Sequence, residues 1–275
     1  MTDARGPVHV DGQVLSVKRV GALHHVTVVA PGIAERFRPG TFVAVSLPDD
    51  DARLARRSFW IHGVRPTGSH GPTLEIVVTA KSAWPRRLVA LGQGARLVLT
   101  GPLGRPFALP REPVTCLLVG EGYAAAPLFP LAERLRERGC VVAMLLAAPD
   151  EEHLLGTLAA RRSARSVTVV TADGSVGVRG AVADVVADQV SRAGADVVYA
   201  AGGRAALHAV AAAAEQHGAW SQTAVETWQP CATGLCHGCP VPVVGEDGVG
   251  RLVRACTEGP VFRGDRVQWV AWEAP

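Results

Sequence analysis

The chain has 275 residues, of which 48% are hydrophobic and 19% charged, and its formal net charge is +3. This length and apolar content suffice for two or three compact domains with cores of their own. The basic residues are scattered, and no basic run is interleaved with aromatic residues, which argues against nucleic-acid binding. No apolar stretch reaches the length of a membrane span and the N-terminus lacks an apolar signal segment, so we expect a cytoplasmic protein without membrane contact.

Short β-branched runs separated by turn residues occupy the first part of the chain, residues 1–112. Proline–glycine and proline–aspartate pairs mark several of the turns, which is typical of hairpin connections. Such spacing predicts a small antiparallel β-barrel. The expected strands are residues 8–17, 23–29, 41–47, 59–64 and 74–79.

Residues 113–223 show a different pattern, in which continuous apolar runs alternate with segments of helical periodicity. This alternation predicts an open parallel α/β sheet. The expected strands are residues 114–119, 141–148, 166–170 and 196–200, and the expected helices are residues 126–139, 151–161, 181–193 and 204–217. Residues 224–275 are irregular and rich in cysteine, glycine and proline, with strand-like runs at 251–254 and 266–272, and we expect them to form a third module.

The six cysteines fall into two groups. Cys116 and Cys140 lie singly inside apolar runs, so we expect buried structural thiols there. A reducing compartment makes disulfides an unsuitable explanation for the other four, which crowd into 26 residues. That crowding indicates a metal centre on Cys231, Cys236, Cys239 and Cys256.

The spacing of these four cysteines is C-x4-C-x2-C, followed by 16 residues and the fourth cysteine. This is the plant-type spacing of a [2Fe–2S] cluster. Gly234 and Gly238 lie within the loop, where glycine lets backbone N–H groups turn towards an anionic cluster. Structural zinc is the alternative, but zinc sites usually pair two C-x2-C hooks or a hook with histidines. His237 lies between two of the cysteines, and we expect it to face solvent rather than a metal.

Four segments carry a resemblance to a known family: Gly101–Gly104, Val119–Leu128, Thr171–Gly177 and the cysteine loop with Gly259–Phe262 after it. With this domain order, the chain resembles the electron-transfer subunit of the two-subunit, NAD-dependent dihydroorotate dehydrogenase, within the ferredoxin–NADP reductase superfamily. The resemblance implies FAD on the barrel, NAD(H) on the α/β domain and a cluster that connects FAD to FMN in a separate catalytic subunit. It also implies a heterotetramer, a role in pyrimidine biosynthesis and no acid–base catalytic residues in this chain.

The same resemblance assigns binding residues. For FAD it implies Arg57, Ser58, Phe59, Trp60, Ile61, Val78 and Thr79, and for NAD(H) it implies Gly120, Gly122, Ala124 and Asp173.

The flavin motifs depart from the family pattern. Trp60 stands where the family has a serine, and we expect its ring to pack beside the flavin or else to plug the pocket. The family's Gly-Thr pair falls near Trp84 and Pro85, and proline has no N–H to offer a phosphate. Arg86 and Arg87 follow at once, so charge can replace the lost contact unless both arginines simply face solvent.

The nucleotide motifs depart as well. Glu121 stands where the family has glycine, and a carboxylate beside a pyrophosphate is repulsive. Residues 201–203 read Ala-Gly-Gly, where the family has Cys-Gly-Pro beside the nicotinamide. We therefore expect weak NAD(H) binding. Two alternatives to a working relay stay open: a non-catalytic scaffold that keeps only the cluster, and a stand-alone NAD(P)H reductase.

The cysteine segment also predicts a contact surface. Residues 232–235, His237 and the turn Gly259–Phe262 are small or apolar, which suits burial against another protein. The alternative is that they pack against this chain's own barrel.

Overall fold

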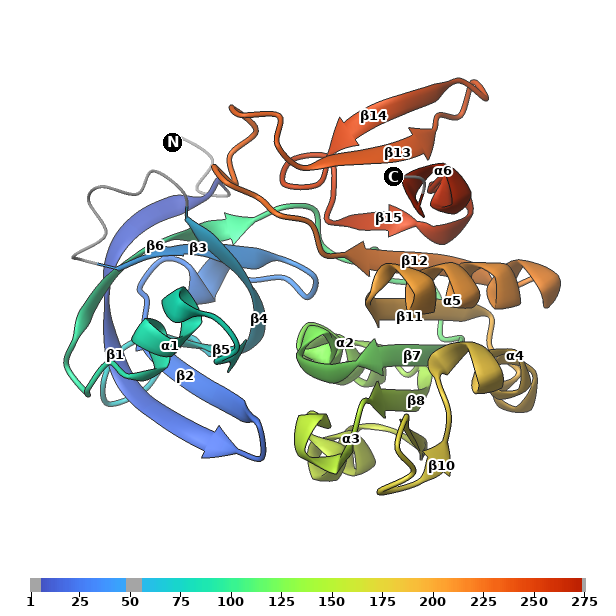
Figure 1. Cartoon of the computed structure of the whole chain (residues 1–275), viewed down its shortest axis with the longest axis horizontal. Helices are drawn as coiled ribbons and strands as arrows, with labels where there is room; N and C mark the ends of the chain where they lie inside the picture. The colour runs from blue at the N-terminus through green and yellow to red at the C-terminus, as the bar shows by residue number, and fades with distance from the viewer. Residues whose placement is uncertain (1–5, 48–55, 274–275) are drawn as a thin grey trace.

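The computed structural model describes residues 6–47 and 56–273. It contains a barrel, an α/β sheet and a cysteine-bearing C-terminal segment, and Figure 1 shows the barrel and the sheet side by side. No helix among these residues is both long and apolar enough to cross a membrane.

The barrel is closed and antiparallel, with strand order β1-β2-β5-β4-β3-β6, as the sequence predicted. Closure leaves no unpaired strand edge. Its interior is filled by inward-facing valine, isoleucine and leucine side chains, and the short helix α1 (Ala83–Val89) adds Trp84 and Leu88 to that core. The strands are β1 (Val8–Val20), β2 (Leu23–Val29), β3 (Phe42–Ser46), β4 (Arg57–Arg65), β5 (Thr73–Thr79) and β6 (Arg96–Leu103).

Part of the barrel's outer surface faces the α/β sheet. Leu23, Trp60 and Val77 alternate with the interior residues of their strands, and they join the hydrophobic core of the sheet instead of the barrel core. Phe42 and Ala44 of β3 and Leu103 of β6 belong to the same core, so the barrel and the sheet share a packed interface to which β2 to β6 contribute.

The sheet has the order β10-β9-β8-β7-β11-β12-β15, and all its strands are parallel except β15. The strands are β7 (Thr115–Glu121), β8 (Val141–Ala148), β9 (Ser166–Thr171), β10 (Val178–Arg179), β11 (Val197–Gly202), β12 (Trp220–Val225) and β15 (Val261–Arg263). The strand order reverses direction between β7 and β11, so loops at the carboxyl ends of both strands border one crevice.

Helices cover both faces of this sheet. Right-handed crossovers place α2 (Leu128–Glu137) and α3 (Thr157–Ser163) on one face, and α4 (Val182–Ala193) and α5 (Arg204–Gln216) on the other. The helix expected over 151–161 is wrong in its bounds. The Asp150 side chain accepts a hydrogen bond from His153 N and caps a single 3-10 turn, and Gly156, with φ of 62°, separates that turn from α3.

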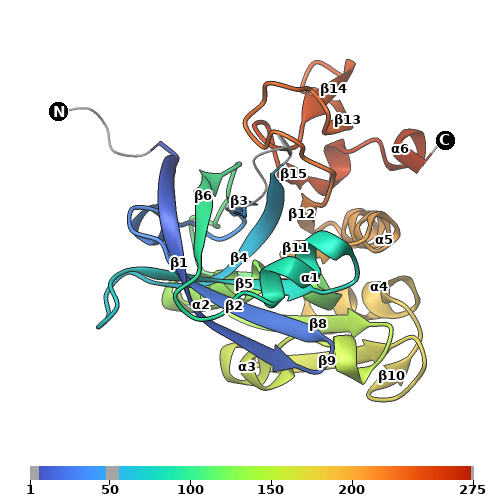
Figure 2. The ribbon, with the colours of Figure 1, turned by 60° about the vertical axis from the view of Figure 1, so that its left-hand side comes forward.

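The C-terminal segment adds a hairpin of β13 (Pro240–Val244) and β14 (Gly250–Arg254) and ends in α6 (Trp269–Glu273). Both views place the hairpin beyond β12, at the outer end of the sheet (Figure 2). The strand expected over 266–272 is wrong. Its alternating apolar residues resemble a strand, but Trp269 is buried as the first residue of α6 and donates to the Gly264 carbonyl.

Candidate functional site

The β13–β14 hairpin brings two distant cysteines together. Cys239 directly precedes β13 and Cys256 lies two residues after β14, and the pairing continues past the strands because Ala255 N donates to Cys239 O at 2.9 Å. As a result the two sulfurs lie 3.4 Å apart and both side chains are buried. They are free thiols, so this is proximity without a disulfide.

The loop before β13 turns its backbone N–H groups towards the other two cysteines. Thr233 N and Cys236 N each lie 3.4 Å from Cys231 Sγ, and Gly238 N lies 3.3 Å from Cys236 Sγ. N–H groups directed at sulfur stabilise a thiolate and an anionic cluster alike. The predicted loop geometry is therefore present, and the donor set fits an iron–sulfur group.

The loop reaches this geometry through left-handed backbone positions. Ala232 and His237 have φ of 58° and 55°, which non-glycine residues adopt at a cost, and such strain concentrates at functional sites. Gly234 has φ of 85°, and a Cβ there would lie 2.8 Å from Thr257 Cγ2. Only glycine therefore fits at 234, next to the segment that carries Cys256.

Cys231 and Cys256 differ in acidity. Burial opposes the ionisation of Cys231, but the donors from Cys236 N and Thr233 N outweigh burial and lower its pKa to about 6. Burial and the contact with Cys239 raise the pKa of Cys256 to about 12. Cys231 is thus favoured as a thiolate, while Cys256 needs the positive charge of a metal to lose its proton.

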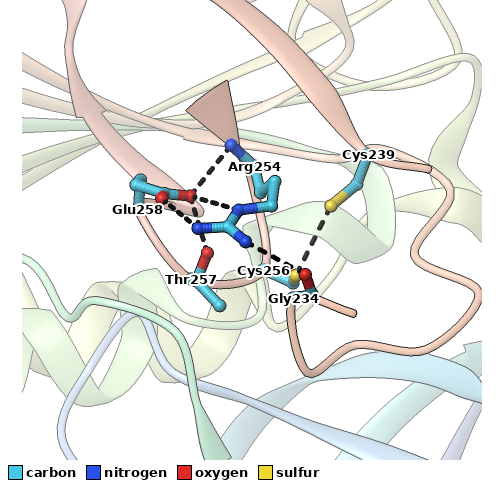
Figure 3. Close-up of polar contacts among 6 residues, drawn as sticks. All are labelled: Gly234, Cys239, Arg254, Cys256, Thr257 and Glu258. Atoms are coloured by element: carbon cyan, nitrogen blue, oxygen red, sulfur yellow. Dashed lines mark hydrogen bonds and ion pairs between the residues drawn. The ribbon is translucent and has the colours of Figure 1, made fainter. Parts of the chain in front are cut away.

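A salt bridge that the sequence analysis missed holds the two cysteine segments together (Figure 3). Arg254 Nη2 contacts Glu258 Oε1 at 2.8 Å, and Arg254 Nη1 donates to the Gly234 carbonyl at 3.0 Å. Thr257 Oγ1 donates to the same carboxylate at 2.6 Å. The Arg254 hydrogen bond is the main reason that the pKa of Glu258 falls to about 2. In the sequence, an arginine and a glutamate four residues apart on either side of Cys256 could have predicted this salt bridge.

The structure separates the residues of the expected contact surface. Leu235 is 83% exposed, and Cys236 and His237 are exposed beside it, whereas Ala232 and Gly234 are buried. Trp228, which the expected surface did not include, is 66% exposed. Gly259–Val261 are buried instead, because β15 pairs with β12 and Phe262 packs over Gly259. That turn belongs to the interior of this chain, and the loop tip alone forms an exposed apolar surface.

A cavity of about 290 Å³ lies between the cysteine segment and the barrel. Ser58, Phe59 and Trp60 line it from β4, and residues 225–229 line it from the segment that leads into the cysteine loop. The Ser58 hydroxyl donates to Gln229 Oε1 at 3.1 Å across the boundary. The cysteine loop and the strand with the expected flavin residues are therefore directly joined.

Glu226 closes one side of this cavity. Its carboxylate accepts hydrogen bonds from Trp60 Nε1 at 2.9 Å and from the Tyr123 hydroxyl at 2.8 Å. Trp60 is 7% exposed, so its ring is part of the wall. Because the indole N–H already donates to Glu226, a bound molecule can contact only the face of the Trp60 ring.

Two buried polar groups in this region, Thr227 Oγ1 and Arg57 Nη1, have no hydrogen-bond partner among the described residues. In the part of the chain that the structure describes, no acceptor faces Arg57 Nη1, which suits a guanidinium that binds an anionic group such as a pyrophosphate. Of the other residues expected at FAD, Ile61 and Val78 point into the barrel core and offer a ligand only their backbone, and Thr79 ends β5, half-buried. Arg57 is not among the residues that line the cavity, but it directly precedes Ser58, which is, so these residues fit FAD in part.

Helix α1 occupies the place of the family's Gly-Thr motif. Trp84 is buried and stacks on Phe59 with ring centroids 5.9 Å apart. Arg86 donates to the backbone carbonyls of Ala80 and Lys81, so its charge secures its own turn. Arg86 is therefore already engaged with its own backbone.

The expected NAD(H) residues lie at the carboxyl edge of the parallel sheet. Gly120 ends the buried part of β7, where a Cβ would lie 2.5 Å from the Ala125 Cβ. Gly122 has φ of 54°, and Ala124 is buried beneath the turn. Asp173 is exposed in the loop after β9 and accepts a hydrogen bond from Ser175 N at 2.9 Å, which lowers its pKa.

Glu121 does not point to open solvent. Its carboxylate accepts a hydrogen bond of 2.8 Å from Gly203 N, the residue that precedes α5. The sequence analysis placed both residues near a nucleotide but did not connect them.

Comparison with known proteins agrees with this architecture. A family model described as the iron-sulfur cluster binding domain of dihydroorotate dehydrogenase B matches residues 228–268. A dihydroorotate dehydrogenase B (NAD(+)) electron transfer subunit of Streptococcus pneumoniae strain R6 is 31% identical over 234 residues, which are 84% of this chain and 87% of that protein. The chain belongs to this family of electron-transfer subunits.

Other family members match over a longer span. The electron transfer subunit of Desulforamulus reducens is 28% identical over 94% of this chain and 98% of its own. Among solved structures, the NADH-dependent reduced ferredoxin–NADP oxidoreductase superposes with a TM-score of 0.82 at 25% identity, over 94% of this chain and 90% of that one. A ferredoxin–NADP reductase from Neisseria gonorrhoeae, with bound FAD and NADP, shares the fold at a TM-score of 0.60 and 14% identity, over 77% of this chain and 92% of its own.

The family assignment confirms the expected fold class, the oxidoreductase assignment and an iron–sulfur domain at the C-terminus. The individual ligand and cofactor-binding residues, and the division at residues 112 and 223, stay predictions.

Proposed function

We propose that the chain passes electrons between NAD(H) and the FMN of a catalytic subunit, through FAD on the barrel and a [2Fe–2S] cluster. The four predicted cysteines would hold the cluster. The observation that supports this most is the hydrogen bond of Ser58 to Gln229, because it joins the cysteine segment to the strand of the expected flavin residues. Two redox groups bound there would be neighbours within one chain.

FAD would supply the conversion between two-electron hydride transfer and one-electron transfer to a cluster. This chain's residues would bind and orient it. Arg57 would neutralise its pyrophosphate, and the Trp60 ring would border the cavity, held by Glu226. At the carboxyl edge of the sheet, Gly120 and Gly122 allow a dinucleotide to approach the backbone, while Glu121 opposes its phosphates.

The family name implies a catalytic partner subunit. We propose that the partner binds FMN, oxidises dihydroorotate in pyrimidine biosynthesis and forms a cytoplasmic heterotetramer with this chain. Leu235, exposed next to Cys236 in the loop, and the exposed Trp228 would be covered by it. Such a contact would place the cluster near the partner's FMN.

A second candidate is a scaffold subunit that keeps the cluster and no longer transfers hydride. Two contacts favour it: Trp60 closes part of the cavity through Glu226, and Glu121 occupies the Gly203 N–H. Under this alternative the protein would bind the partner and the cluster but not flavin.

Composition analysis of anaerobically purified protein tests the proposal. We expect about two iron atoms and two acid-labile sulfides per chain, with about one FAD. Cys236→Ser should lose most of the iron, while Cys140→Ser, which changes a buried thiol outside the loop, should keep it. Cluster without flavin would support the scaffold, and stoichiometric zinc without iron would contradict both.

A further inference from the structure

Two histidines and a glutamate meet on the outer face of the barrel, away from the cysteines. They are His25 on β2, His62 on β4 and Glu75 on β5, and one potential ligand atom from each lies within 4.8 Å of the other two. All three are half-buried. Neither the electron-transfer proposal nor the family assignment gives them a role.

Strand pairing explains why they converge. His25 pairs with Val77 on β5, which places Glu75 two residues further along, on the same face and within side-chain reach. The register between β4 and β5 shifts between Ile61 and Gly63, so His62 is the bulged residue. A bulge redirects a side chain, and here it directs His62 towards Glu75.

The distances suit a shared ion. His25 Nδ1 lies 2.9 Å from Glu75 Oε1, and His62 Nε2 lies 3.7 Å from the same oxygen. Ligand atoms at about 2.1 Å from a tetrahedral zinc ion lie about 3.4 Å from one another, between these two values. A hydrogen bond explains the contact of His25 with Glu75 but not that of His62, because 3.7 Å is too long for a hydrogen bond.

His62 is also oriented as metal-binding histidines are. Its Nδ1 lies 3.2 Å from the Ala126 carbonyl, and a carbonyl can only accept, so Nδ1 carries the proton. This leaves Nε2, the nitrogen directed at Glu75, to bind a metal. The Phe129 ring packs edge-on against His62 with centroids 5.0 Å apart and fixes the ring from the other side.

A metal ion can reach these three side chains from a neighbouring cleft. A cleft of about 830 Å³ between the barrel and α2 is lined by both His62 and Glu75. An ion could enter from this cleft, and a water molecule there would complete a four-coordinate set.

We propose that His25, His62 and Glu75 form a binding site for a divalent transition-metal ion of the zinc type, with its fourth position open to the cleft. Two imidazoles and one carboxylate are ligands that zinc accepts. The ion would join three barrel strands, and through His62 it would anchor the start of α2, at the interface of barrel and sheet.

Zinc binding to the tag-free holoprotein, with its cysteines occupied by the cluster, tests this site. After treatment with EDTA, one equivalent of Zn²⁺ is added under anaerobic conditions and the retained zinc is counted after desalting. We expect one zinc per chain, and at least about tenfold weaker binding in Glu75→Gln, since loss of even an outer partner of a metal ligand costs roughly 10–100-fold. His153→Ala is the matched control, because His153 pairs with Asp150 at 2.7 Å without a third ligand nearby, and it should bind zinc as the unaltered protein does.

X-ray absorption at the zinc edge keeps the test decisive if a variant misfolds. The unaltered protein should show a first shell of nitrogen and oxygen near 2.0–2.1 Å. A sulfur shell near 2.3 Å would mean that zinc sits on the cysteines and would overturn the proposal. Failure to retain zinc, or equal retention by folded Glu75→Gln, would overturn it as well.

Discussion

The Glu121 carboxylate, at the end of β7, accepts a hydrogen bond of 2.8 Å from Gly203 N, directly before α5. Glu121 is the last residue of β7, and Gly203 directly follows β11. The two residues are neighbours because β7 pairs with β11 in parallel. A negative charge at this end of α5 is favourable, since the first N–H groups of a helix lack partners. In this fold such N–H groups are also where an anionic ligand binds, so the chain supplies its own carboxylate at that position.

Replacing Glu121 should therefore strengthen NADH binding. Glu121→Gln keeps an oxygen acceptor for Gly203 but removes the charge, and we expect the dissociation constant to fall about fivefold, which corresponds to about 1 kcal/mol, the repulsion of two unit charges about 4 Å apart in water. Glu121→Gly should lower the dissociation constant for NADH at least as much. Calorimetric titration of anaerobic protein measures the change, with Glu137→Gln on the exposed face of α2 as control. Unchanged affinity in both Glu121 variants would show that the carboxylate does not oppose the nucleotide.

Arg57 should decide whether FAD stays bound. Its unpaired, buried Nη1 predicts that Arg57→Ala loses most of the flavin during purification while the iron content is unchanged. Arg86→Ala is the control, because Arg86 binds its own backbone carbonyls, and it should keep the flavin. The flavin-to-iron ratio from the visible spectrum and metal analysis reports both. Equal flavin loss in the two variants would remove Arg57 from the site.

Trp60→Ser separates the two interpretations of the same cavity. If the indole borders a bound flavin, the substitution should lower flavin occupancy or leave it unchanged, because ring contact is lost. A sharp rise in occupancy would instead identify Trp60 as a plug, held in place by Glu226.

The Arg254–Glu258 pair should stabilise the cluster loop. Arg254→Lys keeps the charge but cannot reach both the carboxylate and the Gly234 carbonyl, so we expect a less stable cysteine loop and faster release of iron in air. The same change in Arg251, which pairs with Asp247 in the exposed hairpin turn, should have little effect. Equal iron-release rates in the two variants would contradict the role of Arg254.

This pair also predicts a pH dependence. The pKa of Glu258 is lowered to about 2, so its stabilising contribution is complete above the ordinary glutamate pKa of about 4.3 and is lost as the pH falls from there towards 2. Glu258→Gln should therefore release iron faster than the unaltered protein at pH 7, and the difference should shrink below about pH 4.3.

The exposed tip of the cysteine loop should bind the partner subunit. Leu235→Asp should abolish co-purification with the flavoprotein partner while the chain's own cluster content stays normal, because an exposed side chain contributes little to the fold. Leu158→Asp, at a leucine 70% exposed on α3, should leave the complex intact. Hydrogen exchange provides a second measurement, with protection of residues 231–239 expected only in the complex.

The sequence was most informative where the signal is local. Three of the four cysteines lie within nine residues, and the fourth, Cys256, comes close to Cys239 in the structure, while the role of all four as cluster ligands stays a prediction. The alternation of apolar runs predicted the barrel and the parallel sheet. Residues 266–272 were misassigned because alternating apolar residues fit both a strand and a short helix that buries Trp269. Contacts that depend on strand register were not predictable: Glu121 with Gly203, and His25 with His62 and Glu75.

Anaerobic titration of the holoprotein with NADH, followed by visible and electron paramagnetic resonance spectroscopy, tests the electron-transfer account most directly. The account predicts that NADH bleaches the flavin bands and then the cluster bands, and that the signal of a reduced [2Fe–2S] cluster appears. The contrary result is a cluster that stays oxidised in excess NADH although dithionite reduces it. That result would mean that electrons do not pass from the nucleotide to the cysteine site in this chain.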